Sequence, residues 1–115
     1  MQRYQVIKHR HVKRDLQRAW RYLLAEASAV VAERFLKKVE KTFDDLALMP
    51  ELGTFYESDQ PELQSLRQWT VKGFKKYIIF YYANEARHQL HIIRVLHGSL
   101  DVGSILELGI SPDDL

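Results

Sequence analysis

Polar and apolar residues alternate near the start of the chain, over residues 3–8 (RYQVIK). Side chains of a strand point in turn to opposite faces, so this stretch predicts a short strand. From Val12 the apolar period lengthens to that of a helix, with one face formed by Val12, Leu16, Ala19, Trp20, Leu23 and Ala27. Lysine, arginine and glutamine fill the opposite face. The pattern predicts an amphipathic helix with a basic outer surface.

A second helix is predicted after Ser28, whose hydroxyl suits the N-cap position. Its apolar stripe repeats at helical spacing and consists of Val31, Phe35, Val39, Phe43 and Leu46. Proline at position 50 and glycine at 53 predict its end near Met49–Pro50. Residues 50–66, which carry several acids and a second proline, are predicted to form an irregular connector.

Three strands are predicted in the second half of the chain. Residues 68–72 alternate, with Trp69 and Val71 as the apolar positions, and residues 73–76 (GFKK) predict a turn. Residues 77–83 (YIIFYYA) are apolar on both faces, which is typical of a central strand covered on both sides. A second turn is predicted at residues 84–87, followed by the last strand at residues 90–97 (LHIIRVLH).

Asp101 is placed to cap a short terminal helix that runs to Leu108. Helices grouped before hairpin-linked strands predict an α+β fold. We expect an N-terminal strand, a two-helix hairpin packed on a small antiparallel or mixed sheet of about four strands, and a short C-terminal helix. The chain has 115 residues and no internal repeat, so residues 1–115 are predicted to form one domain.

Composition narrows the class of protein. The chain contains no cysteine, which excludes disulfides, a thiolate nucleophile and cysteine-ligated metal centres. Hydrophobic residues make up 46% and charged residues 28%, a balance typical of a folded globular chain. The longest nearly uncharged run, Tyr77 to Asn84, is far shorter than a membrane span of roughly 20 residues. The N-terminus has no apolar stretch of signal-peptide length, so we expect a cytoplasmic protein.

Lysine and arginine are concentrated in two parts of the chain. Residues 1–24 and 67–100 have net charges of +6 and +5, whereas residues 25–66 and 101–115 have −5 and −4, in agreement with +2 overall. Two basic segments that meet in the fold would form a positive face that attracts nucleic acid or an acidic partner protein. The alternative is that the charges are solvated surface groups.

Common catalytic and metal-binding patterns are weak or absent. His9 and His11 form an H-x-H pair, but the lysine and arginine residues around it would repel a divalent cation. We therefore predict no metal and no cofactor. His97, Ser99 and Asp101 have the residue types of a catalytic triad, yet they lie too close in sequence to converge on one reacting centre. The chain has no G-x-S-x-G, phosphate-binding glycine loop or H-E-x-x-H motif.

A metal-independent ribonuclease needs cations beside a group that transfers protons. Lysine or arginine would stabilise the phosphorane, and tyrosine or histidine would move a proton. Of the strand aromatics, only Tyr77 or Tyr81 is kept as an exposed contact, because alternation sends about half of them to the core. The candidate catalytic residues are Lys72, Lys75, Lys76, Tyr77, Arg94 and His97.

A series of short motifs follows a fixed order along the chain. It includes L-A-x-x-P-x-x-G at residues 46–53, L-R-x-W-x-V-x-G-F at 66–74, G-F-x-x-Y at 73–77, and R-V-L-H-G at 94–98 before Asp101. With these motifs the chain resembles the RelE/ParE superfamily of bacterial type II toxins, and more closely its ParE branch, over nearly its whole length. The resemblance implies the RelE/ParE-like fold and a small cytoplasmic toxin that arrests growth, stabilises plasmids and forms a hetero-oligomer with an antitoxin.

The two branches imply different targets. ParE-type toxins poison DNA gyrase by binding, whereas RelE-type toxins cut messenger RNA in the ribosome. The resemblance favours the ParE-like, non-enzymatic action, with the ribosome-dependent endoribonuclease as the alternative. The partner-binding residues that it suggests are Arg67, Arg94, His97 and Asp101.

One position departs from the family pattern. Members often have arginine directly before the terminal aspartate, where this chain has Leu100. Loss of a guanidinium removes a bidentate donor, so the activity is weakened or lost, or the target contact lies elsewhere. Two further alternatives are structural: an ion pair of Arg94, for example with Asp101, and a hydrogen-bonded His97 at a strand end.

Overall fold

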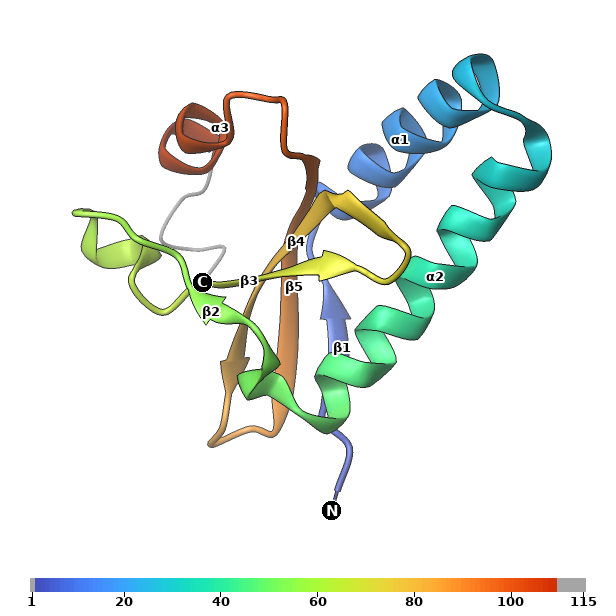
Figure 1. The fold of residues 1–115 in the computed structure, drawn as a ribbon. Coiled ribbons are helices and arrows are strands. Elements are labelled where there is room, and N and C mark those ends of the chain that lie inside the picture. The colour runs from blue at the N-terminus through green and yellow to red at the C-terminus, as the bar shows by residue number, and fades with distance from the viewer. Residues whose placement is uncertain (1, 110–115) are drawn as a thin grey trace.

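A five-stranded mixed sheet lies at the centre of residues 2–109, the part of the chain that the structure, a computed structural model, describes. Its elements in chain order are β1 (Gln5–Lys8), α1 (Val12–Glu26), α2 (Ala29–Leu48), the 3-10 turn η1 (Pro50–Leu52), β2 (Thr54–Phe55), the 3-10 turn η2 (Pro61–Leu63), β3 (Arg67–Val71), β4 (Phe74–Asn84), β5 (Gln89–His97) and α3 (Val102–Gly109). The α+β prediction is confirmed (Figure 1).

The strand order is β1-β5-β4-β3-β2. β1 pairs with β5 in parallel, and the other neighbours are antiparallel. The prediction of about four strands missed β2, which lies in the expected connector. β2 has only two residues and pairs Thr54 with Gln68 and Phe55 with Arg67. Such a short strand leaves no alternation to detect in the sequence.

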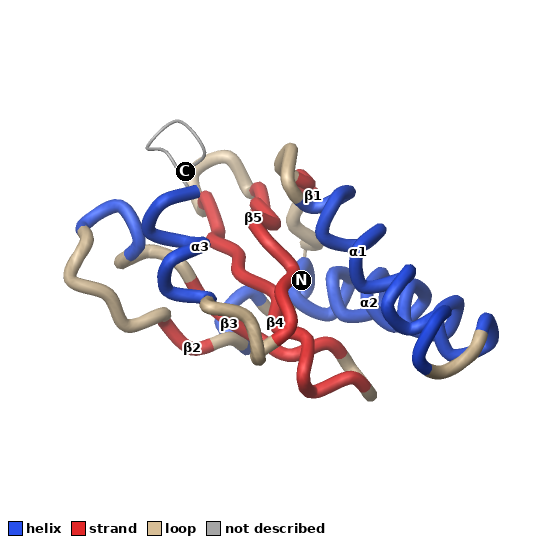
Figure 2. Tube along the Cα trace, turned by 90° about the horizontal axis from the view of Figure 1, so that it is seen from above, coloured by secondary structure: helices blue, strands red, loops and turns tan. Residues whose placement is uncertain are grey.

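Helices cover the two faces of the sheet unequally. In Figure 2 the α1–α2 hairpin lies on one side of the strands and α3 on the other. β4 serves both cores: Ile79 and Tyr81 belong to the cluster under the hairpin, and Phe80 belongs to the cluster under α3. This agrees with the predicted central strand covered on both faces. No helix within residues 2–109 is long and apolar enough to cross a membrane.

Local chemistry sets the ends of the elements. The Ser28 hydroxyl accepts a hydrogen bond from the Val31 amide at 3.1 Å, which confirms the predicted N-cap of α2. Asp101 likewise precedes α3 and accepts a bond from the Ser104 amide at 3.3 Å. The turn predicted at residues 73–76 is wrong in its extent, because β4 already begins at Phe74. Gly73, with φ of 79°, makes the reversal in a conformation that other residues avoid.

A threonine on α2 holds the β3–β4 hairpin. The buried Thr42 hydroxyl donates to the Lys38 carbonyl at 2.7 Å and accepts from the Lys72 amide at 3.0 Å. Thr42→Val keeps the shape but leaves that amide without its partner, so we expect a loss of about 1–2 kcal/mol in the free energy of unfolding. Urea unfolding would measure it, with Thr70→Val on the exposed side of β3 as the control. Equal losses for both variants would contradict this role.

Candidate functional site

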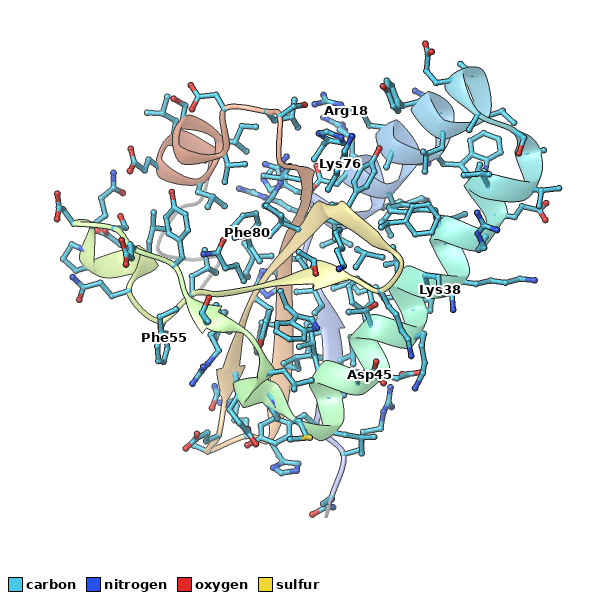
Figure 3. The ribbon with its side chains drawn as sticks, in the orientation of Figure 1. Arg18, Lys38, Asp45, Phe55, Lys76 and Phe80 are labelled. Atoms are coloured by element: carbon cyan, nitrogen blue, oxygen red, sulfur yellow. The ribbon has the colours of Figure 1, made fainter. Side chains whose placement is uncertain are left out.

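Two adjoining cavities open between α1, the β3–β4 hairpin and the C-terminal end of β5. Their volumes are about 210 and about 530 Å³, and both are lined by Tyr22, Tyr77 and His97. Arg18 lines the smaller cavity, and Lys75 and Lys76 line the larger one. We call the two together the basic cleft. Figure 3 shows Arg18 and Lys76 at the same end of the molecule.

The cleft brings together the two basic segments of the sequence. Arg18 comes from residues 1–24, and the two lysines come from residues 67–100. Among the described residues 2–109, the only acidic residue that lines either cavity is Asp15, in the smaller one. Its charge is compensated by Arg94, so the cleft carries a net positive charge. The expected positive face is therefore present here.

Aromatic rings form the wall between the two cavities. Tyr77 is buried, and its ring meets that of His97 edge to face, with centroids 5.0 Å apart. Burial raises the pKa of the Tyr77 hydroxyl, with a smaller contribution from Tyr22. His97 accepts a hydrogen bond at Nδ1 from the Ser99 amide at 3.0 Å. Tyr77 is thus a wall of the cleft and not the exposed contact that the sequence suggested.

Asp15, which lines the smaller cavity, forms a largely buried ion pair with Arg94. Arg94 Nε and Nη2 each donate to the Asp15 carboxylate at 2.8 Å, and the Val95 amide donates to it at 3.0 Å. The exposed fractions of the two side chains are 4% for Asp15 and 13% for Arg94. The suggested structural alternative, an ion pair of Arg94, is confirmed, but its partner is Asp15 of α1 and not Asp101. Arg94 therefore holds α1 to β5.

Two other candidate partner-binding residues have structural contacts. Asp101 accepts a bond from the Ser104 hydroxyl at 2.8 Å, and the bonds from Ser104 lower the pKa of the Asp101 carboxyl. Arg67 donates to the Gly53 carbonyl at 2.7 Å and lies 3.9 Å from the centre of the Phe55 ring. Both residues secure neighbouring segments, Asp101 the start of α3 and Arg67 the β2 edge.

The three candidate lysines are divided between two surfaces. Lys76 lines only the basic cleft, Lys72 lines only a second groove, and Lys75 lines both. That second groove lies beside the exposed side chains of Leu48, Met49 and Trp69. Of the six candidate catalytic residues, the structure therefore brings together Lys75, Lys76, Tyr77 and His97, and it separates Lys72 and Arg94 from them.

Tyr81 is a structural residue, and the prediction that it is a possible exposed contact is wrong. Its side chain is fully buried. The hydroxyl accepts a bond from the Gly53 amide at 2.8 Å and donates to the Pro50 carbonyl at 2.6 Å. Burial raises the pKa of Tyr81 to about 12, against the lowering effects of the Gly53 bond and of Arg67.

This shift predicts a loss of stability at alkaline pH. The unfolded tyrosine ionises near its ordinary pKa of 10.0, whereas folded Tyr81 stays neutral up to about pH 12. Its contribution is therefore full below pH 10.0 and is lost as the pH rises to about 12. We expect urea unfolding to show this decline and Tyr81→Phe to reduce it, with Tyr22→Phe as the control. An unchanged decline in Tyr81→Phe would refute the assignment.

The histidines of the N-terminal edge contact one another. His9 Nε2 and His91 Nδ1 lie 2.8 Å apart, and the His91 ring stacks on Tyr82. Burial lowers the pKa of His91, with a further lowering from His9. Within residues 2–109 no three histidine, cysteine or acidic side chains gather where they could hold a metal ion.

Comparison with protein families connects this geometry to a known class. The family model described as the ParE toxin of the type II toxin-antitoxin system parDE matches residues 6–102. The chain belongs to the ParE toxin family. The match begins at Val6 in β1, runs through the end of β5 and includes the residues that line the basic cleft. Among curated proteins, none matches the sequence.

Two solved structures have a fold similar to that of this ParE-family chain. A chain of the chromosomal ParDE toxin–antitoxin system from P. aeruginosa superposes with a TM-score of 0.65 at 13% identity, covering 82% of this chain and 95% of that one. A chain of the RelBE2 toxin–antitoxin complex from Mycobacterium tuberculosis gives a TM-score of 0.57 at 24% identity, covering 84% and 99%. At these identities the likeness shows the fold.

Sequence reasoning missed two lining residues of this ParE-family cleft, Arg18 and Tyr22. Both lie on α1 and follow Asp15 at helical spacing, so a signal was present in the basic helix face. The sequence does not show that this part of α1 lies beside the end of β5. The ion pair between Asp15 and Arg94 establishes that contact.

Proposed function

We propose that this ParE-family chain is a toxin that inhibits DNA gyrase by binding it. The family match over residues 6–102 is the observation that carries the proposal. The resemblance of the sequence to ParE-type toxins supplies the target. The basic cleft supports a binding mode, because it offers cations, aromatic rings and apolar walls on one surface.

The positions of two candidate catalytic groups favour binding over RNA cleavage. The Nε and Nη2 atoms of Arg94 are both engaged by the Asp15 carboxylate, so Arg94 has limited capacity to stabilise a phosphorane. Tyr77 is buried and has a raised pKa, which makes it a poor proton carrier near neutral pH. Inhibition by binding requires neither group to react.

A ribosome-dependent endoribonuclease is the second candidate function. The observation in its favour is that Lys75, Lys76 and His97 line one cleft. Two cations could stabilise a phosphorane there, and the histidine could transfer a proton. The endoribonuclease and the gyrase inhibitor would use the same surface. They must therefore be distinguished by their effects on DNA and on messenger RNA.

Induction of the chain alone in bacteria separates the two functions. We expect DNA breaks or a loss of negative supercoiling, with translated messages intact. Cuts in translated messages at a fixed codon position, with normal supercoiling, would contradict gyrase inhibition and support the endoribonuclease. The absence of both effects in a folded chain would mean that toxic action has been lost. Leu100, which stands where family members often have arginine, would be a reason for such a loss.

A purified supercoiling assay tests the surface. We expect Lys76→Glu to weaken gyrase inhibition by about ten-fold, because a rim cation becomes an anion. Lys37→Glu makes the same change at an exposed position of α2 and does not alter the cleft. Equal effects of the two variants would show that overall charge, and not this cleft, governs inhibition.

We further propose a cognate antitoxin as the neutralising partner, in a hetero-oligomer in the cytoplasm. The two similar structures belong to toxin–antitoxin systems by their titles, which supports such a partner here. Co-expression with the gene encoded beside this one should restore growth, and the two products should purify together from the soluble cytoplasmic fraction. Growth arrest that persists despite an equal amount of that product would count against this pairing.

A further inference from the structure

The smaller cavity of the basic cleft has an apolar interior. Four apolar residues, Ala19, Val95, Leu96 and Leu100, are among those that line it, and we call these four residues the apolar socket. The first three are buried and Leu100 is half-buried. The cavity volume is about 210 Å³. Because a cavity of roughly 150 Å³ accommodates a benzene ring, the socket has room for one aliphatic side chain.

Polar residues also line the cavity that contains this socket. Arg18, Tyr22, His97 and Ser99 line the same cavity, and Lys76 follows in the adjoining one. The nearby carboxylate of Asp15 is engaged by Arg94 and by the Val95 amide. An anionic group at the mouth would therefore meet cations, while a neighbouring apolar group enters the socket.

We propose that the basic cleft binds an acidic protein segment that inserts one aliphatic side chain into the apolar socket. The inference deepens the proposed function and rests on it for one point, that the natural ligand of the cleft is a protein. Charge complementarity selects an acidic segment, and the apolar walls select an aliphatic anchor. The anchor fixes the position of the segment, and the carboxylates contact the rim.

The shape of the cleft favours a protein segment over RNA. Base recognition uses exposed aromatic faces for stacking. Tyr77 is 6% exposed, and its ring is turned edge to face against His97 and tilted against Phe35. Tyr22, at 55% exposed, offers one ring for stacking, so the preference for a protein segment rests on the apolar socket. The socket itself presents aliphatic carbon, which an uncharged aliphatic side chain matches better than a polar base does.

Leu100 is the specificity-determining residue of this arrangement. It lies in the turn between β5 and α3 and forms one wall of the socket. A charged side chain at this position would bring a guanidinium or ammonium group to the place of the aliphatic anchor. Binding of the aliphatic group would then require desolvation of a charge. The identity of residue 100 therefore decides whether the cleft accepts an apolar anchor.

Nuclear magnetic resonance titration of the isotope-labelled full chain tests this inference. The probes are a short capped peptide of glutamates with a central leucine, the same peptide with a central glycine, and a short oligouridylate. We expect the leucine peptide to bind about ten-fold more tightly than the glycine peptide, with shifted amide signals at Val95, Ser99 and Leu100. Leu100→Arg should remove this preference.

Two further variants make the outcome decisive. Leu108→Arg introduces the same charge on α3 at a leucine that is 88% exposed, and it should leave the preference intact. Ala19→Leu fills the socket from α1 and should remove the preference even if Leu100→Arg fails to fold. Equal binding of the two peptides by the folded chain, or tighter binding of oligouridylate at the same amides, would overturn the inference. Gyrase inhibition by the same preparations shows separately whether the proposed function holds.

Discussion

Replacing Asp15 by alanine is expected to lower the free energy of unfolding by about 3–5 kcal/mol. The change removes the carboxylate that binds Arg94 twice at 2.8 Å and accepts the Val95 amide. Arg94, whose side chain is 13% exposed, would keep a charge without its partner. The size of the effect comes from that stranded charge and amide, since an intact buried pair is only weakly stabilising.

Urea unfolding followed by circular dichroism would measure this loss. Asp44→Ala is the matched control, because Asp44 also pairs with an arginine, Arg3, but both side chains are about half exposed. An exposed pair contributes less than about 1 kcal/mol. A double variant, Asp15→Leu with Arg94→Met, should recover part of the stability because no buried charge remains. Similar losses for Asp15→Ala and Asp44→Ala would refute the assigned role.

The second large effect is expected for Gly53→Ala, at about 3 kcal/mol of unfolding free energy. A Cβ atom at Gly53 would collide with the Tyr81 hydroxyl and lie 2.7 Å from the Gln68 carbonyl oxygen. The backbone of Gln68 belongs to β3, so it has little freedom to move. Glycine is required here by the close approach of Tyr81 and β3, and not by an unusual backbone angle.

Thermal and urea unfolding of three variants would test this explanation. Tyr81→Phe alone should cost about 1–3 kcal/mol, because the Gly53 amide and the Pro50 carbonyl lose their partner. The double variant should be less destabilised than the sum of the two single changes, since the colliding hydroxyl is absent. Strict additivity would show that the clash with Tyr81 does not determine the effect. Gly98→Ala, whose nearest atom would lie 3.4 Å away, serves as the glycine control.

The helices could be predicted from the sequence because each carries a long periodic signal. The stripe from Val31 to Leu46 and the cap at Ser28 placed α2 within a residue or two of its observed bounds, Ala29–Leu48. β4 was predictable for a similar reason, since an apolar run on both faces indicates a strand with two cores. Where several local signals agree, the fold follows them.

The candidate site was harder to predict because it depends on contacts between distant segments. Asp15 is the only acidic residue among residues 1–24, yet no local pattern shows that it is buried against β5. The sequence therefore leaves the partner of Arg94 open, and the structure identifies it as Asp15. The burial of Tyr81 could not be predicted, because strand alternation gives two faces but does not say which elements cover them. The lysines of the hairpin could be assigned to the surface, since nothing in the pattern buries them.

The hydrogen bond from the Val95 amide to Asp15 affects which mutations would abolish toxicity. Arg18 follows Asp15 by less than one helical turn, and His97 follows Val95 by two residues, so one ion pair fixes the spacing of the two sides of the cleft. A selection for harmless mutants would therefore recover changes at Asp15 and Arg94 alongside changes in residues that touch the target. A change at Asp15 should be compensated by a second change at Arg94, and the reverse. A change at a residue that contacts the target should instead be compensated by a change in the target protein.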